Sequence, residues 1–181
     1  MRIIAGAWRG RPLIAPPGKA TRPTSDRARE GLFSMLASRI GSFERLEVAD
    51  LFAGTGALGL EALSRGAAHC LFVDSDPAAL AVLKRNVETL GAAARATIRA
   101  QTAEHAAAPP RPCDLVLIDS PYRTGMADAV LARITAGGWL APGAWISVET
   151  AGEELAVPET LELDAQRRFG KATITLLRAR A

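Results

Sequence analysis

Three glycines at a fixed spacing constrain the fold of this chain more than any other feature. Gly54, Gly56 and Gly59 have the Gly-x-Gly-x-x-Gly spacing, and they follow an apolar run over residues 48 to 53. Such a run predicts a buried strand, and residues 58 to 65 predict a helix after the turn. In a strand-turn-helix unit of this kind, the first glycine permits a tight turn, the second lets the backbone approach a ligand, and the third lets the helix pack closely on the strand.

A carboxylate after the next predicted strand indicates what the glycine turn would bind. Asp74 closes the apolar run over residues 69 to 73, and it lies 20 residues after Gly54. At this distance the glycine motif places an acid that binds a ribose hydroxyl. The sequence therefore predicts a ligand that carries adenosine.

A second carboxylate, Asp50, lies inside the otherwise apolar first strand. An unpaired carboxylate would be costly there, so we expect a cationic or hydrogen-bonding partner. A dinucleotide offers Asp50 little to bind, whereas the ammonium group of S-adenosylmethionine could lie beside it. Another interpretation stays open at this point, because loop amides alone could hold the carboxylate.

Predicted strands and helices alternate along the rest of the chain. After the first strand, further strands are expected at residues 69–74, 95–100, 114–118 and 144–150, and helices at 77–90 and 126–136. The order is typical of an α/β fold, with an open, mostly parallel sheet and helices on both faces. Ligands of such sheets bind outside the carboxyl ends of the strands, and Asp74, Gln101 and Asp119 all follow predicted strands.

Both ends of the chain predict additions to this pattern. Residues 2 to 15 predict a short hairpin, and residues 161 to 163 and 173 to 177 predict the two strands of a closing hairpin. Between the first hairpin and the glycine unit, Thr24 or Ser25 can cap a helix whose apolar residues recur up to Ile40.

The segment Asp119-Ser120-Pro121-Tyr122 suits the methylation of a planar amino group. The amine of a nucleobase is a poor nucleophile, because its lone pair is delocalised into the ring. It must be held with its hydrogens on two acceptors, here the carboxylate of Asp119 and the carbonyl of Ser120, while Tyr122 stacks on the base. Pro121 favours an extended Ser120, and no metal is needed, because catalysis is mostly orientation. Alternatively, the segment is only a turn.

Charge is distributed unevenly along the chain. Residues 1 to 29 hold seven basic residues against one acidic residue, within a chain of net charge +3. A basic amino-terminal arm suggests a polyanion as partner, although a solvated basic tail is equally compatible with the composition.

The remaining composition excludes several classes of protein. The chain has 181 residues, enough for one domain with a small extension, and no run long enough to span a membrane. The amino terminus does not have the pattern of a signal peptide, so we expect a cytoplasmic protein. Cys70 and Cys113 have no metal-binding spacing and are expected to be structural thiols, and we expect no bound metal.

Several segments together resemble one family of class I methyltransferases. They are Met1 to Arg11, the Arg-Pro-Thr-Ser-Asp-Arg-Ala-Arg-Glu run over residues 22–30, Asp50 to Gly66, and the Phe-Gly-Lys run over residues 169–171. In this order they are similar to the RsmD family, the guanine-N2 methyltransferases of bacterial small-subunit (16S) ribosomal RNA. The resemblance implies a Rossmann-like class I methyltransferase domain over residues 24–181 and a basic arm over residues 1–23.

The resemblance also implies roles for individual residues. Asp50 and the glycines Gly54, Gly56 and Gly59 would hold the methionine part of S-adenosylmethionine, Asp74 the ribose and Gln101 the adenine edge. Asp119, Ser120, Pro121 and Tyr122 would hold the target guanine. The arm would bind 16S ribosomal RNA or the small ribosomal subunit through Arg2, Trp8, Arg9, Arg11, Arg22, Arg27 and Arg29. One residue departs from the family: Ser120 stands where Pro is usual, which removes one restraint on the loop.

Other functions remain compatible with the sequence. The same cofactor could methylate a DNA adenine or a protein glutamine, because both present planar amino groups. A non-catalytic protein that binds RNA or aids ribosome assembly is compatible with Ser120. A nicotinamide oxidoreductase is disfavoured, since nothing resembles a site for hydride transfer.

Overall fold

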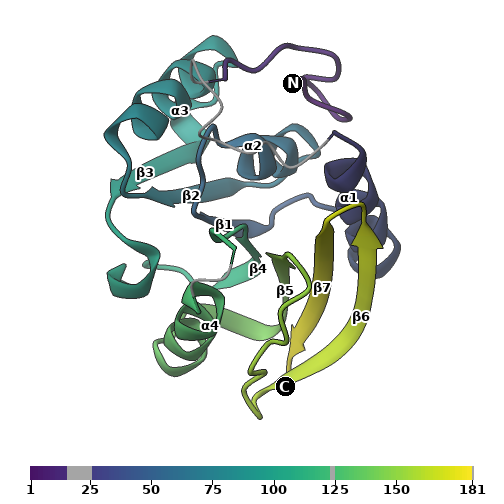
Figure 1. Cartoon of the computed structure of the whole chain (residues 1–181). Helices are drawn as coiled ribbons and strands as arrows, with labels where there is room; N and C mark the ends of the chain where they lie inside the picture. Colours follow the sequence, from purple (N-terminus) through teal and green to yellow (C-terminus); the bar gives the residue numbers. More distant parts are fainter. Residues whose placement is uncertain (16–25, 123–124, 181) are drawn as a thin grey trace.

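The computed structural model describes residues 1–15, 26–122 and 125–180. These residues form a seven-stranded sheet of order β3-β2-β1-β4-β5-β7-β6 (Figure 1). Strands β1 to β5 are parallel, whereas β7 is antiparallel to β5, and β6 is antiparallel to β7. The strands are β1 Glu47–Leu51, β2 His69–Asp74, β3 Ala96–Ala100, β4 Cys113–Ile118, β5 Leu140–Thr150, β6 Leu161–Phe169 and β7 Ala172–Ala179. The α-helices are α1 Asp26–Ile40, α2 Ala57–Ser64, α3 Pro77–Thr89 and α4 Met126–Ala136.

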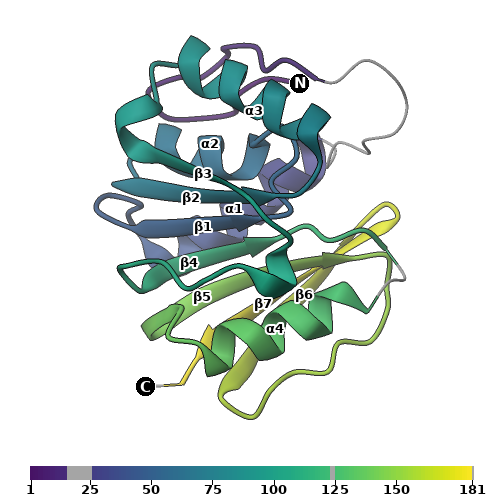
Figure 2. The same cartoon turned by 90° about the vertical axis from the view of Figure 1, so that its left-hand side faces the viewer.

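Both faces of the sheet are covered, because successive residues of a strand point to opposite faces. Phe72 of β2 belongs to the core that α1, α2 and α3 cover, whereas the next residue, Val73, belongs to the core that α4 covers. Figure 2 shows α2 and α3 at one end of the sheet and α4 beside β5 and β6. The predicted α/β fold, mostly parallel and with helices on both faces, is confirmed.

Some boundaries differ from those expected. Strand β1 ends at Leu51, because Phe52 already belongs to the turn, with φ of 64°. Strand β5 begins earlier than expected, at Leu140, and the closing hairpin is longer, since β6 continues to Phe169. The expected helix cap at Thr24 or Ser25 lies outside the described residues.

The amino-terminal segment, residues 1 to 15, folds back on itself and packs on the sheet domain. An antiparallel bridge joins Arg2 and Pro12, and Ile3 and Leu13 are buried in the core with α1 and α2. The predicted hairpin is therefore present, although it forms a single bridge and no extended strands. The buried carboxylate of Glu61 in α2 fastens the segment, because it accepts hydrogen bonds from the amides of Ile4 (2.8 Å) and Ala5 (3.0 Å).

The tip of this segment, residues 6 to 10, lies against the end of α2. The amides of Ala7 and Trp8 donate to the carbonyl and the hydroxyl of Ser64, at 2.8 and 3.0 Å. Helix α2 begins at the glycine turn and ends at Ser64. Its eight residues span about 12 Å, so the tip lies toward the edge of the sheet opposite the glycine turn, on the left of Figure 2.

Two other features of the described residues bear on the sequence predictions. Cys70 and Cys113 are buried free thiols, and burial raises the pKa of Cys113 to about 12. A thiol that stays protonated is unreactive, which agrees with a structural role. No helix in the described ranges is long and apolar enough to cross a membrane.

Candidate active site

The carboxyl ends of β1, β2 and β4 bring the predicted site residues together. Leu51 pairs with Val73 of β2 on one side and with Ile118 of β4 on the other, so the three strands end side by side. Asp74 and Asp119 come at or directly after these ends. The sheet therefore places both carboxylates beside the glycine turn that follows β1.

The glycine turn is tied directly to the ribose-binding candidate. The amide of Gly54 donates a hydrogen bond of 2.7 Å to Oδ2 of Asp74, and the amide of Asp76 donates one of 2.8 Å to Oδ1. Each carboxylate oxygen can accept more than one hydrogen bond. Asp74 can therefore hold the turn and still accept a hydroxyl from a ligand.

The three glycines have different surroundings. A Cβ at Gly54 would meet only a carbonyl 4.0 Å away, whereas at Gly56 it would lie 2.3 Å from Leu83, and at Gly59 2.4 Å from Phe72. Gly54 therefore leaves its backbone open to a ligand, and Gly59 permits helix packing as expected. At Gly56 the protein itself fills the space that a Cβ would need, and its φ of 81° further favours glycine, while its role in ligand approach remains a prediction.

Asp50 is fully buried, and it has the amide partner that the alternative interpretation proposed. The amide of Gly59 donates a hydrogen bond of 2.9 Å to its Oδ2. Burial raises the pKa of Asp50 well above its usual range, and the negative charges of Asp119 and Asp74 raise it further. Asp119 and Asp74 thus each act on Asp50 at the same edge of the sheet, and a bound cation would favour the ionised form of Asp50.

Gln101 follows β3 at this same edge. The backbone amide of Gln101 donates a hydrogen bond of 3.0 Å to the backbone carbonyl of Asp74, and the side chain of Gln101 is exposed. The side chain is thus available next to the ribose-binding candidate. Its contact with an adenine edge remains a prediction.

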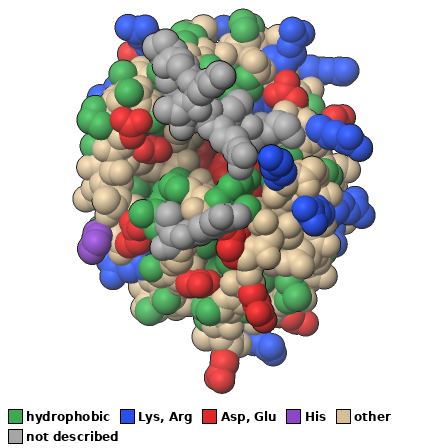
Figure 3. All heavy atoms as spheres, viewed as in Figure 1, with side chains coloured by type: hydrophobic (Ala, Val, Ile, Leu, Met, Phe, Trp, Pro, Cys, Tyr) green, Lys and Arg blue, Asp and Glu red, His purple; other side chains and the backbone are tan. Residues whose placement is uncertain are grey.

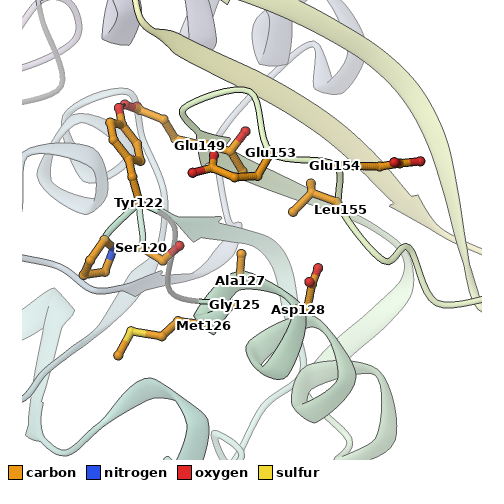
Figure 4. Close-up of a pocket in the computed structure, with 12 residues that line it drawn as sticks. Ser120, Tyr122, Gly125, Met126, Ala127, Asp128, Glu149, Glu153, Glu154 and Leu155 are labelled. Atoms are coloured by element: carbon orange, nitrogen blue, oxygen red, sulfur yellow. The ribbon is translucent and has the colours of Figure 1, made fainter.

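The loop from Asp119 to Tyr122 borders a pocket on the α4 side of the sheet (Figure 4). The amide of Asp119 lies 3.4 Å from the carbonyl of Leu51, which joins the loop to the end of β1. Ser120 is buried, and the hydroxyl of Tyr122 donates a hydrogen bond of 2.7 Å to Glu149. Four acidic residues line the pocket: Asp128 of α4, Glu149 of β5, and Glu153 and Glu154 of the segment that follows β5.

Glu149 is a site residue that the sequence interpretation missed. It lies in β5 one residue before the strand ends, and it is 7% exposed. Its sequence signal equals that of Asp50, namely one carboxylate near the carboxyl end of an apolar strand. Applying the same argument to β5 would have found it.

The basic residues expected to bind RNA are placed differently from one another. Arg2, Arg9, Arg11 and Arg27 are exposed, and Trp8 is half-buried with the guanidinium of Arg95 5.0 Å above its ring. Arg11 also donates to the carbonyl of Thr89. Arg22 lies outside the described residues.

Arg29 cannot have the role that the sequence suggested. Its side chain is 0% exposed, it pairs with Asp26 at 3.0 Å, and it donates to the carbonyl of Arg2. Burial lowers its pKa, while Asp26 and Glu61 oppose that shift. Arg29 therefore joins α1 to the amino-terminal segment and does not face RNA.

The carboxylates at this edge are not arranged as a metal site within the described ranges. Across the ranges that the structure describes, no group of three or more His, Cys, Asp or Glu side chains could hold a metal ion.

Comparison with known proteins identifies the family. The family described as "Conserved hypothetical protein 95" matches residues 1–178. Ribosomal RNA small subunit methyltransferase D of Escherichia coli (strain K12) is 37% identical, over 100% of this chain and 91% of its own length. The same enzyme of Haemophilus influenzae is 36% identical, over 94% of this chain and 89% of its own length.

Solved structures agree with this assignment. A structure of the candidate methyltransferase yhhF from Escherichia coli superposes with a TM-score of 0.88 at 37% identity, covering 100% of this chain and 98% of its own. At 14% identity, an RNA methyltransferase from Salinibacter ruber in complex with S-adenosyl-L-homocysteine shares the fold, with a TM-score of 0.69 over 88% of this chain and 94% of its own. The chain therefore belongs to the Conserved hypothetical protein 95 family, which is the RsmD family of class I methyltransferases that its sequence resembles.

Proposed function

We propose that the protein transfers a methyl group from S-adenosylmethionine to the exocyclic N2 of a guanine in small-subunit ribosomal RNA. The observation that carries this proposal is the meeting of two loops at one sheet edge: the glycine turn, fastened to Asp74, and the loop from Asp119 to Tyr122. The names of the relatives support ribosomal RNA as the class of substrate. The partner would be the free RNA or the small ribosomal subunit.

The carboxylates beside the glycine turn fit the proposed cofactor. When bound, S-adenosylmethionine supplies an electrophilic methyl group on a positively charged sulfur atom. The negative charges of Asp119 and Asp74 act on the buried Asp50, and a cationic ligand would offset them. Asp74 would bind the ribose hydroxyls and Gln101 the adenine edge.

The residues of the other loop would orient the guanine. Asp119 and the carbonyl of Ser120 would accept the two N2 hydrogens, which directs the nitrogen lone pair toward the methyl carbon, and Tyr122 would stack on the base. Transfer would break the carbon-sulfur bond as the carbon-nitrogen bond forms, and N2 would then release one proton to solvent. The partly buried hydrogen bond between Tyr122 and Glu149 would hold the ring in place.

The test is the transfer of labelled methyl groups from S-adenosylmethionine to unmodified small-subunit ribosomal RNA, to small ribosomal subunits and to DNA. We expect label in N2-methylguanosine after digestion to nucleosides, and no label with the variant Asp119→Ala. Calorimetry should show that this variant still binds S-adenosylmethionine.

Each other result would contradict a different part of the proposal. Label in methyladenine would overturn the choice of base, and full activity of Asp119→Ala would remove Asp119 from catalysis. Binding of S-adenosylmethionine without transfer to any RNA or DNA would favour a protein substrate or a non-catalytic role.

A further inference from the structure

The turn between β6 and β7 lies at the same sheet edge as the candidate active site. Strand β7 is antiparallel to β5, and its residue Thr173 pairs with Thr150, the last residue of β5. Phe169 of β6 pairs with Ala172 directly after the turn. Because β5 ends at the carboxyl edge of the parallel strands, the β6–β7 turn is there as well, at the right of Figure 2.

Helix α1 presents its amino-terminal end to the same turn. A Cβ added to Gly31 would lie 2.3 Å from the ring of Phe169, so the ring occupies the space that this glycine leaves. At the other end of the helix, Arg39 pairs with Asp164 of β6. Helix α1 therefore runs antiparallel to β6. Arg27 lies one helical turn before Gly31 on the same face of α1, so it is next to the position where the ring of Phe169 packs.

Four exposed cations lie at the β6–β7 turn or on the neighbouring turn of α1. We call Arg27, Arg167, Arg168 and Lys171 the turn surface; all four are exposed. Within the described part of the chain, none of the four is in an ion pair. The neighbouring carboxylates Asp26 and Asp164 are already paired with other arginines, and Glu30 is the exposed acid nearby on α1.

Unbalanced cations repel one another, and the repulsion is relieved when they bind a polyanion. Figure 3 shows where this would happen: blue side chains lie on one side of the central hollow, over α1 and the end of the β6–β7 hairpin, and red side chains lie within and below the hollow. Phosphates would avoid the acidic pocket and bind the basic side. The base would enter the pocket, where Asp119 and the carbonyl of Ser120 would accept its amino hydrogens.

The amino-terminal tip is placed less favourably for this purpose. Residues 6 to 10 contact Ser64, at the end of α2 remote from the glycine turn. Arg9 can still bind RNA there, but it lies toward the opposite edge of the sheet. We propose that the turn surface binds the phosphates next to the target nucleotide and so holds the RNA strand against the active site. The inference rests on the proposed ribosomal RNA methylation, which it deepens by naming the surface that positions the substrate.

The test compares two triple variants that remove the same charge. The first is Arg167→Gln/Arg168→Gln/Lys171→Gln. The matched control is Arg45→Gln/Arg178→Gln/Arg180→Gln, and all three arginines are exposed. Arg45 precedes β1, Arg178 is near the end of β7 and Arg180 follows it, so they lie at the opposite edge of the sheet. The affinity of wild type and of each triple variant for transcribed small-subunit ribosomal RNA is measured between about 50 and 200 mM salt.

We expect the turn-surface variant alone to bind more weakly, with the slope of log affinity against log salt smaller by about 2, as three lost phosphate contacts predict for a single strand. Its KM for RNA should rise, while its affinity for S-adenosylmethionine should equal that of wild type. Because Arg168 also donates to the carbonyl of Gly170, the single variants Arg167→Gln and Lys171→Gln are measured too, and each should account for part of the loss.

The outcomes separate the inference from the function on which it rests. If wild type methylates ribosomal RNA but the two triple variants behave alike, the turn surface is not an RNA contact and the proposed function stands. If wild type transfers no methyl group, yet its RNA binding still depends on the turn surface, the contact stands and the enzymatic proposal fails. If the single variants have no effect and the triple variant has a lower melting temperature, its loss reflects damage to the turn, and the inference is overturned.

Discussion

Tyr122 donates its hydroxyl hydrogen bond to Glu149 over 2.7 Å, and this contact joins the proposed base-binding loop to the end of β5. The carboxylate is buried, so the bond is made where water competes little. The ring that would stack on the base is thus oriented by a strand of the sheet, which is more rigid than its own loop. Precise placement of the base then depends on a residue that does not touch it.

Replacing either partner should slow methyl transfer. Tyr122→Phe keeps the ring but removes the donor, and Glu149→Gln weakens the acceptor, so each should lower kcat about tenfold or more by allowing the base to shift. Affinity for S-adenosylmethionine should not change. The double variant should be no slower than the slower single variant, because both changes remove the same contact. Single-turnover assays on ribosomal RNA check this.

The control for that pair is Glu88→Gln, an exposed carboxylate on α3, which should leave kcat at the wild-type value. Strictly additive losses in Tyr122→Phe and Glu149→Gln would show that the two side chains act independently.

Glu61 should determine whether the amino-terminal segment stays attached. Its carboxylate accepts from the amides of Ile4 and Ala5 and pairs with Arg65 at 2.9 Å, all while 0% exposed. An amide in its place would donate where acceptors are needed, so Glu61→Gln should lower the free energy of unfolding by about 2 kcal/mol. Limited proteolysis should then cut within residues 1–15 before the rest of the chain. Equal cleavage rates in the variant and wild type would contradict this role.

Two arginines of α1 should separate stability from RNA binding. Arg29 is buried and paired, so Arg29→Gln should lower the free energy of unfolding by about 3 kcal/mol. Arg27 is exposed, so Arg27→Gln should keep the melting temperature but reduce the salt dependence of RNA binding. Thermal melts and binding titrations on the same two variants check both statements. A stable Arg29→Gln with weakened RNA binding would restore the role that the sequence suggested.

Much of the candidate site could be predicted because it depends on local patterns. The glycine spacing, the apolar strands and the carboxylates at their ends follow from rules about parallel sheets, and the structure brings Asp50, Asp74 and Asp119 together as those rules require. The hydrogen bond between Gly54 and Asp74 joins the ends of two strands that are consecutive in the sequence. Such contacts need little knowledge of the rest of the chain.

The missed features depend on contacts between distant segments. Arg29 was expected at the surface because arginine usually is, and its burial requires the amino-terminal segment to cover α1. The space at Gly56 is filled by Leu83 of α3. Strand β6 was predicted too short because it is an edge strand with mostly exposed residues and lacks the apolar alternation of a covered strand.

Asp50 should make the free protein less stable at higher pH. Its pKa is raised well above the usual range by burial and by the charges of Asp119 and Asp74. A group whose pKa is higher in the folded state stabilises the fold below its unfolded pKa, and this contribution is lost as pH rises through the folded pKa. Asp50→Asn cannot ionise, and its amide oxygen can still accept from Gly59. The melting temperature of this variant relative to wild type should therefore increase with pH, starting near pH 4, about the pKa of an unfolded Asp.

The same substitution should weaken the proposed cofactor site. Asp50 can ionise beside a bound sulfonium or ammonium and attract it, whereas Asn cannot, so the affinity of Asp50→Asn for S-adenosylmethionine should fall while the free protein gains stability. Calorimetry and melting curves on one preparation measure both effects, with Glu154→Gln as an exposed control from the neighbouring pocket. A melting difference that does not change with pH would mean that Asp50 titrates normally. Unchanged affinity would mean that its carboxylate serves only to hold the amide of Gly59.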